Sequence, residues 1–191
     1  VCIINTCTVT ESADSSSRHS IRQLAKQNPE AKLIVTGCSA EKQPEEIRKI
    51  AGVSAIVPNG NKELLVASLF PEQDVPEFSI KNFDSHTRAF VKVQDGCNSY
   101  CSYCIIPFVR GRSRSRAVPE IRKEVEGLIK GGFKEVVITG INVGDFDGDG
   151  TACLADLVRE IDALPGLERL RVSSIDPDEV DDNLLDAIIN G

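Results

Sequence analysis

The sequence predicts an α/β protein with an amino-terminal open parallel sheet with flanking helices, followed by a partial parallel (β/α) barrel. Short apolar runs rich in β-branched residues alternate along the chain with segments of helical periodicity. These runs lack polar alternation, which is typical of strands buried on both faces of a parallel sheet. The chain has 191 residues, 41% hydrophobic and 27% charged, so it has room for two small globular domains.

The first domain is expected over residues 1–70. Ser12 is expected to cap a helix that ends by Asn28-Pro29. Pro44 suits the first turn of a short helix that Gly52 stops. A further helix is expected at 61–70, and strands are expected at 1–5, 32–36 and 55–57. Alternation of this kind predicts an open parallel sheet.

Residues 71–87 have mixed charge and two prolines, and they are expected to form a linker. The second domain is expected over residues 88–191. Its predicted strands lie at 89–93, 135–139 and 167–173, and its predicted helices at 119–130, 154–164 and 179–189. Three βα units are too few to close a parallel barrel. The three units therefore fit either a doubly wound sheet or an incomplete barrel.

The net charge of −7 is unevenly distributed. Residues 88–141 carry 10 basic and 5 acidic side chains, whereas residues 142–191 carry 3 and 13. Four arginines fall within seven residues that contain no acid: Arg110, Arg112, Arg114 and Arg116. Such a run indicates either a solvated basic loop or a local surface for nucleic-acid phosphates.

The chain has no apolar run of the roughly 18 residues that a membrane helix needs, and no secretory signal is visible. It contains no methionine and begins at Val1, so we expect an internal piece of a longer reading frame. Seven cysteines in a chain with regular βα alternation favour metal ligands or free thiols over a disulfide framework. We therefore expect a reducing, cytoplasmic compartment.

The strongest motif is C-x3-C-x2-C, formed by Cys97, Cys101 and Cys104 directly after a predicted strand. A loop in this position opens at the carboxyl edge of a parallel sheet, where α/β folds place their sites. A structural zinc site needs four protein ligands, so zinc would require a distant fourth residue. A 4Fe–4S cluster held by three cysteines leaves one iron open to an outside ligand.

Residues 90–116, which contain Val-Gln-Asp-Gly-Cys at 93–97, resemble the methylthiotransferases of the radical S-adenosylmethionine (SAM) superfamily. Asn-Thr-Cys-Thr-Val-Thr at 5–10 and Val-Thr-Gly-Cys at 35–38 resemble the amino-terminal domain of that family. Thr-Gly-Ile-Asn-Val-Gly at 139–144 and Arg-Val-Ser-Ser-Ile-Asp-Pro at 171–177 resemble its barrel. The resemblance is greatest to the branch that acts on threonylcarbamoyladenosine beside the tRNA anticodon.

The resemblance implies an enzyme with two 4Fe–4S clusters and SAM as cofactor. Cys97, Cys101 and Cys104 are expected to hold the cluster that donates one electron to SAM and cleaves its sulfonium, giving methionine and a 5′-deoxyadenosyl radical. Cys7 and Cys38 are expected to be ligands of a second, auxiliary cluster, whose third cysteine in the family lies upstream of Val1. Cys2 and Cys153 match no family ligand position and are expected to be ordinary thiols.

The remaining expectations concern the cofactor and the partners. Gly140, Asn142, Ser173 and Ser174 lie at strand ends and are expected to help hold the cofactor, and Tyr103 is expected to pack near its adenine or merely against the protein. The arginine run is expected to face a tRNA anticodon stem-loop, although some of its members could instead tie the loop to acidic residues. The expected electron donor is a protein such as flavodoxin or ferredoxin.

Several alternatives stay open. Related branches act on isopentenyladenosine in tRNA or on a ribosomal-protein aspartate, and the same cysteines would also suit a non-catalytic iron–sulfur or zinc module. A D-x-D-x-D-G pattern that begins at Asp145 resembles a calcium loop. A strand precedes that pattern where an EF-hand has a helix, so an acidic turn that caps the next helix is the better interpretation.

Overall fold

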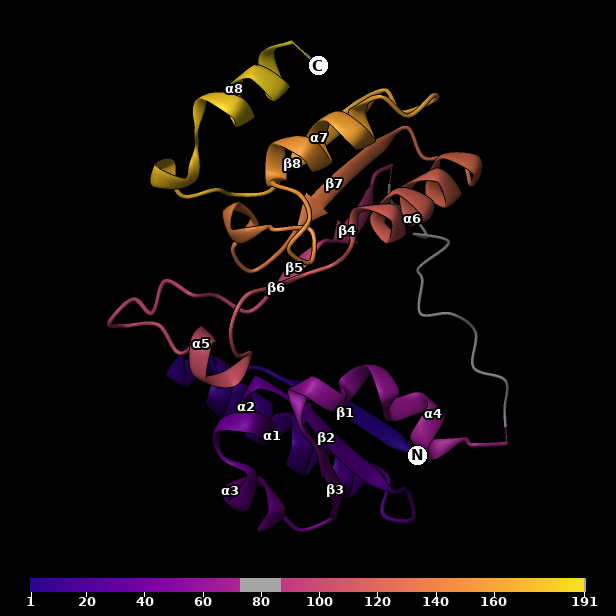
Figure 1. Ribbon diagram of the computed structural model, residues 1–191. Coiled ribbons are helices and arrows are strands. Elements are labelled where there is room, and N and C mark those ends of the chain that lie inside the picture. The colour runs from indigo at the N-terminus through magenta and orange to yellow at the C-terminus, as the bar shows by residue number, and fades with distance from the viewer. Residues whose placement is uncertain (73–86, 191) are drawn as a thin grey trace. The chain divides into compact units, whose positions relative to one another are not determined.

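The computed structural model describes residues 1–72 and 87–190 (Figure 1). These residues form two compact units. The first contains residues 1–72 and 100–111, and the second contains residues 87–99 and 112–190. Most of the expected linker, residues 73–86, lies outside the described residues. No helix in the described ranges is long and apolar enough to cross a membrane.

The first unit contains a parallel sheet in the order β1-β2-β3. Its strands are β1 (Cys2–Thr6), β2 (Leu33–Gly37) and β3 (Val53–Val57). All five residues of the central strand β2 are buried. The register pairs Thr6 with Gly37, so β1 and β2 end at the same level. This sheet confirms the three strands expected from the sequence.

Six short or medium helices accompany this sheet: α1 (Glu11–Gln27), α2 (Cys38–Lys42), α3 (Pro44–Arg48), the 3-10 helix η1 (Asn59–Leu64), α4 (Leu65–Leu69) and α5 (Ile106–Val109). Ile21 of α1 and Ile47 of α3 are buried with Leu33 and Val35 of β2. Burying each such side chain contributes about 1.5–3 kcal/mol, so these contacts hold the helices on the sheet.

The expected cap of the first helix was wrong. Thr10 is the N-cap, and its Oγ1 accepts a hydrogen bond from the backbone N–H of Ala13 at 3.1 Å. Ser12 lies inside the first turn of α1. The extended backbone of Thr10 (φ −128°, ψ 158°) is the geometry that an N-cap requires.

The second unit contains a parallel sheet in the order β4-β7-β8. Its strands are β4 (Ala89–Lys92), β7 (Glu135–Thr139) and β8 (Arg169–Val172). The helices are α6 (Val118–Lys130), α7 (Leu154–Asp162) and α8 (Asp182–Ile189), with 3-10 turns η2 (Val143–Asp145) and η3 (Pro177–Glu179). Three successive βα units of this kind are the partial barrel that the sequence predicts.

A short antiparallel ribbon of β5 (Gln94–Asp95) and β6 (Arg114–Ser115) extends from the end of β4. The core of the unit lies where α6 and α7 pack on the sheet (Figure 1). Val91 and Ile138 of the sheet, Ile121 of α6, and Leu157 and Ile161 of α7 are all fully buried there. This core fixes the strand ends from which the site loops emerge.

Candidate cluster and cofactor site

The cysteine loop follows β5 and contains two residues with positive φ, one before Cys97 and one before Cys101. Gly96 has φ +78°, and Tyr100 has φ +47°, a left-handed conformation that costs a non-glycine residue about 1–3 kcal/mol. The Tyr100 ring meets the Phe108 ring of α5 edge-on, with centroids 6.0 Å apart. This aromatic contact helps to hold Tyr100 in its strained conformation.

The loop's three thiols differ in exposure. All seven cysteines of the chain are described and free; Cys97 and Cys104 are half-buried and Cys101 is exposed. The backbone N–H of Ser99 lies 3.4 Å from Cys97 Sγ, and the N–H of Cys104 donates to the Cys101 carbonyl at 2.9 Å. Among the described residues, no three Cys, His, Asp or Glu side chains are grouped to hold a metal. The donor set itself, three free thiols on one short loop, fits an iron–sulfur cluster.

Hydrogen bonds between backbone N–H groups and side chains tie the start of this loop to the segment after β7 and to the residue before β6. The N–H of Asn98 donates to Asp145 Oδ2 at 3.3 Å, and Asn98 Oδ1 accepts from the N–H of Ser113 at 3.2 Å. Farther along, Asp156 Oδ2 accepts from the N–H of Cys153 at 2.9 Å, and this hydrogen bond lowers the pKa of Asp156. The Asp156 carboxylate thus caps the start of α7, whereas the Asp145 carboxylate holds the cysteine loop.

Gln94 is a site residue that the sequence did not indicate. It is 1% exposed, although it is polar. Its Nε2 donates to the Gly96 carbonyl and to Ser113 Oγ, each at 2.8 Å. Its Oε1 accepts from the N–H groups of Ile141 and Asn142, each at 3.0 Å. One side chain thus joins the residue before Cys97 to the turn that follows β7.

Gly140 and Asn142, both expected at the cofactor, are brought together by this arrangement. A side chain at Gly140 would meet Gln94 Oε1 at 2.8 Å, so glycine is required for the close approach. Asn142 is 8% exposed, and its Nδ2 donates to Glu179 Oε1 at 2.7 Å. Glu179 Oε2 is buried without a partner among the described residues, and it occupies the space where Gly144 would carry a Cβ.

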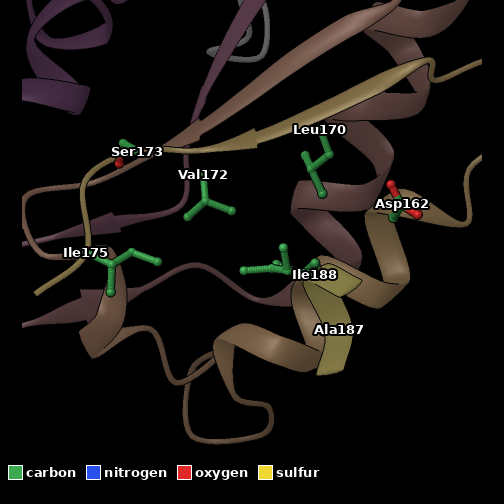
Figure 2. A pocket seen from close by; sticks show the side chains of 8 residues that line it. Asp162, Leu170, Val172, Ser173, Ile175, Ala187 and Ile188 are labelled. Carbon is green, nitrogen blue, oxygen red and sulfur yellow. The ribbon is translucent and has the colours of Figure 1, made fainter. Parts of the chain in front are cut away.

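The structure does not gather every expected cofactor residue. Ser173 is half-buried at the end of β8, where its N–H donates to the Ile138 carbonyl at 3.0 Å, and Ser174 is exposed. Ser173 lines a groove of about 400 Å³ between β8, α7 and α8 (Figure 2). The groove is mostly apolar, and neither Gly140 nor Asn142 lines it. Tyr103 is 90% exposed.

The four arginines of the basic run have different surroundings. Arg116 Nη1 donates to Glu124 Oε2 at 2.7 Å and to the Lys92 carbonyl at 2.9 Å. Arg110 is half-buried. Arg112 and Arg114 are exposed, and within the described residues neither forms an ion pair. Arg116 is therefore engaged with the protein, and Arg112 and Arg114 offer their charge to solvent.

Cys7 and Cys38 lie at one edge of the first unit's sheet. Cys7 directly follows β1, and Cys38 begins α2 directly after β2. Thr6 and Gly37, the residues before them, are partners in the ladder. The sequence expectation that both thiols share one sheet edge is thus met. Cys7 is exposed and Cys38 is 4% exposed.

Side chains of α1 fasten both of these cysteine segments. Ser17 Oγ accepts from the Cys7 N–H at 3.1 Å and donates to the Cys7 carbonyl at 2.9 Å. Asp14 Oδ1 accepts from Ser39 Oγ at 2.7 Å, and Asp14 Oδ2 accepts from Arg18 at 2.9 Å. Burial by itself would raise the pKa of Asp14. The hydrogen bonds from Ser39 and Arg18, together with the Arg18 charge, have the larger effect, so the pKa is lowered overall. The two segments therefore share a fixed polar anchor.

Comparisons with known proteins agree with both halves of this description. Residues 91–190, about half of the chain, match the Radical SAM superfamily. Residues 1–58 match a family described as Uncharacterized protein family UPF0004. These ranges cover the first sheet, the second sheet except the first two residues of β4, and the cysteine loop.

Similar curated proteins are methylthiotransferases. The chain is 50% identical over 189 residues to the threonylcarbamoyladenosine tRNA methylthiotransferase MtaB of Chlamydia pneumoniae, covering 98% of this chain and 45% of that protein. It is 36% identical to the MtaB of Aquifex aeolicus, covering 100% of this chain and 50% of that protein. The chain thus spans about half the length of these relatives, and they confirm the resemblance stated from the sequence.

The fold has a counterpart among solved structures. The radical SAM methyltransferase TsrM from Kitasatospora setae, solved with cobalamin and a 4Fe–4S cluster bound, superimposes with a TM-score of 0.68 at 17% identity. The likeness covers 97% of this chain and 46% of that one, and it confirms the expected fold class. With the superfamily match over half its length and this fold, the chain belongs to the radical SAM superfamily.

Proposed function

We propose that the protein to which this chain belongs is a tRNA methylthiotransferase that adds a methylthio group to threonylcarbamoyladenosine next to the anticodon. The observation that carries this proposal is the 50% identity to the MtaB of Chlamydia pneumoniae over 98% of the chain. The three-cysteine loop and the paired Cys7 and Cys38 segments fall within that aligned length.

We assign residues 1–70 to an amino-terminal methylthiotransferase domain and residues 88–191 to part of the radical SAM barrel. The two separate parallel sheets and the two family matches support this division. The boundary between the two compact units falls within the cysteine loop, because residues 100–111 belong to the first unit.

Cys97, Cys101 and Cys104 are the proposed ligands of a 4Fe–4S cluster. When bound, this cluster and SAM supply the one-electron cleavage that starts radical chemistry, and the protein supplies ligands and orientation. Three thiol ligands suit this role because they leave one iron position open. Gln94 holds the carbonyl just before Cys97, so it fixes where the loop begins.

Asn142 and Gly140 form the proposed cofactor-binding turn. Gln94 anchors the backbone of this turn, and Glu179 orients the Asn142 side chain. Ser173 and Ser174 would contribute from the end of β8, and Tyr103 from the cysteine loop. Support for these three residues comes from the family resemblance and from their positions in the chain.

Cys7 and Cys38 are the proposed ligands that this chain gives to an auxiliary cluster. Their common position at the ends of β1 and β2 supports the assignment. Two thiols are one fewer than the family uses, so this site needs a third cysteine from upstream in the full-length protein.

The proposed substrate is the anticodon stem-loop of tRNA. Exposed Arg112 and Arg114 suit phosphate contacts, whereas Arg116 with its Glu124 partner suits a supporting role. We propose Arg110 as a further phosphate contact. A tRNA substrate fits a cytoplasmic enzyme, and flavodoxin or ferredoxin is the proposed source of the electron.

The test is a reaction of the anaerobically reconstituted full-length protein with SAM, a reductant and tRNA that carries threonylcarbamoyladenosine. Nucleoside mass spectrometry is expected to detect the methylthio derivative, and no product is expected from the Cys97→Ala variant. Parallel reactions with isopentenyladenosine tRNA and with ribosomal protein separate the related branches. Modification of either of these in place of threonylcarbamoyladenosine would overturn the proposal.

A further inference from the structure

The carboxamide of Asn59 reaches two elements of the first unit. Asn59 begins η1, just beyond the carboxyl end of β3. Its Nδ2 lies 3.8 Å from Cys38 Sγ and 3.1 Å from the carbonyl oxygen of Val109. A carboxamide nitrogen carries two hydrogens, so one is available for the sulfur and the other for the carbonyl. The backbone N–H of Asn59 donates to Glu41 Oε2 of α2 at 2.9 Å, which fixes the base of this side chain.

The two groups that Asn59 joins belong to different cysteine segments. Cys38 is buried at the start of α2 and is a proposed ligand of the auxiliary cluster. Val109 ends α5, the helix that begins two residues after Cys104. Helices α2 and α5 are in contact and lie side by side (Figure 1). Within the described residues, Asn59 Nδ2 is the one hydrogen-bonding group recorded at Cys38 Sγ.

We propose that Asn59 is a positioning residue that donates an N–H···S hydrogen bond to Cys38, raises the reduction potential of the auxiliary cluster and ties that ligand to α5. This inference rests on the proposed role of Cys38. A hydrogen bond to a ligating sulfur withdraws electron density from the cluster, so it favours the reduced state. Because Val109 is 2% exposed and α5 packs on α2, the same bond keeps the sulfur at a fixed place beside α5.

The experiment isolates the auxiliary cluster in the full-length protein by changing Cys97, Cys101 and Cys104 to Ala. In this background the midpoint potential is measured by a redox titration followed by electron paramagnetic resonance (EPR). Asn59→Ala is expected to shift the midpoint to a more negative value. Asn59→Asp, which has the same shape but no donor and adds a negative charge, is expected to shift it further.

The matched control is Asn61→Ala. Asn61 is exposed on the same helix and makes no side-chain hydrogen bond to the described residues, so its removal is expected to leave the midpoint unchanged. Iron content and apoprotein melting temperature are measured for every variant. A cluster of full iron content whose midpoint is unmoved by Asn59→Ala would overturn the inference while leaving the proposed function intact.

Two other outcomes would also count against the proposal. Loss of iron from Asn59→Ala but not from Asn59→Asp would show that Asn59 acts by filling space, because Asp fills the same space without donating. Absence of any cluster from the isolating background would remove the auxiliary site and, with it, both the inference and that part of the proposed function.

Discussion

Gln94 shows how one buried amide can order a whole site. All of its hydrogen-bonding groups have partners, on the cysteine-loop side and on the turn after β7. Leaving buried polar groups unpaired costs about 1–3 kcal/mol for each group. The residue therefore links the stability of the second unit to the geometry of both loops.

Replacing Gln94 with Leu is expected to lower the free energy of unfolding by about 2–3 kcal/mol, because the Ile141 and Asn142 amides lose their acceptor. Urea denaturation measures the change. The control is Gln23→Leu, the same substitution at an exposed position of α1, which is expected to change the stability by less than about 0.5 kcal/mol. Equal effects at the two positions would contradict the role given to Gln94.

Two glycines give a second residue-scale prediction. A Cβ at Gly144 would collide with the Glu179 carboxylate, whereas a Cβ at Gly127 in α6 meets nothing within 4 Å. Gly144→Ala is expected to destabilise the protein by about 1–3 kcal/mol through overpacking. Gly127→Ala is expected to stabilise it by about 0.5–1 kcal/mol through helix propensity. Thermal melts of both variants check the opposite signs, and a stabilised Gly144→Ala would refute the Glu179 contact.

At the scale of elements, the β7–β8 pair is joined by charges as well as by its ladder. Glu135 lies opposite Arg169 in the strand register. Its Oε2 is 2.9 Å from Arg169 Nη1, and its Oε1 is 2.5 Å from Arg171 Nε. Hydrogen bonds from these two arginines lower the pKa of Glu135. A carboxylate whose pKa falls on folding adds stability above its unfolded pKa and loses it as the pH drops through the folded value.

The Glu135→Gln variant is expected to be less stable than the parent at pH 7 and equally stable well below the ordinary Glu pKa of about 4.3. The difference is expected to shrink in high salt, because the arginines are half exposed. Urea midpoints at neutral and acid pH, each at two salt concentrations, measure it. A difference that does not change with pH would contradict the charge-based account.

Elements differed in how well the sequence predicted them. β7 lies at the expected residues, and α6 begins one residue earlier than expected. The strand has a continuous apolar run, and the helix has strong apolar periodicity and a clear stop signal. The short helices α2 and α5 and the ribbon β5–β6 were not predicted. Elements of two to five residues are too short to show a hydrophobic period in the sequence. A two-residue strand exists only through its hydrogen bonds to a partner strand, which the sequence does not reveal.

The site residues that were predicted from the sequence are those with a local signal, and the residues that act through distant contacts were missed. Cys97, Cys101 and Cys104 were identified by their spacing, which is a local signal, whereas Cys7 and Cys38 were assigned from the family resemblance. Gln94 is a polar residue just past the strand expected at 89–93, so nothing in the local pattern indicated that its side chain is buried. Gln94 lies where β4 ends and β5 starts. Its side chain is buried because it contacts residues 113 and 140–142, which are distant in sequence. Asn59 and Asp14 likewise act through partners distant in sequence.

At the scale of the molecule, the chain combines two parallel sheets. Cys7 and Cys38 directly follow strands of the first sheet, and the three-cysteine loop follows the ribbon strand β5 that extends from β4. The acidic overall charge conceals a basic stretch that holds the cysteine loop and exposed Arg112 and Arg114. This arrangement supports an account in which the three-cysteine loop binds a cluster with an open iron, and the adjoining arginines meet an anionic substrate.

The central claim is tested most directly by EPR of the reduced, anaerobically reconstituted full-length protein, in a Cys7→Ala/Cys38→Ala background that leaves the cluster at Cys97, Cys101 and Cys104. The account predicts a 4Fe–4S signal whose g-values change when SAM is added, because the cofactor binds the open iron. A signal that is indifferent to SAM, or zinc in place of iron, would contradict the account.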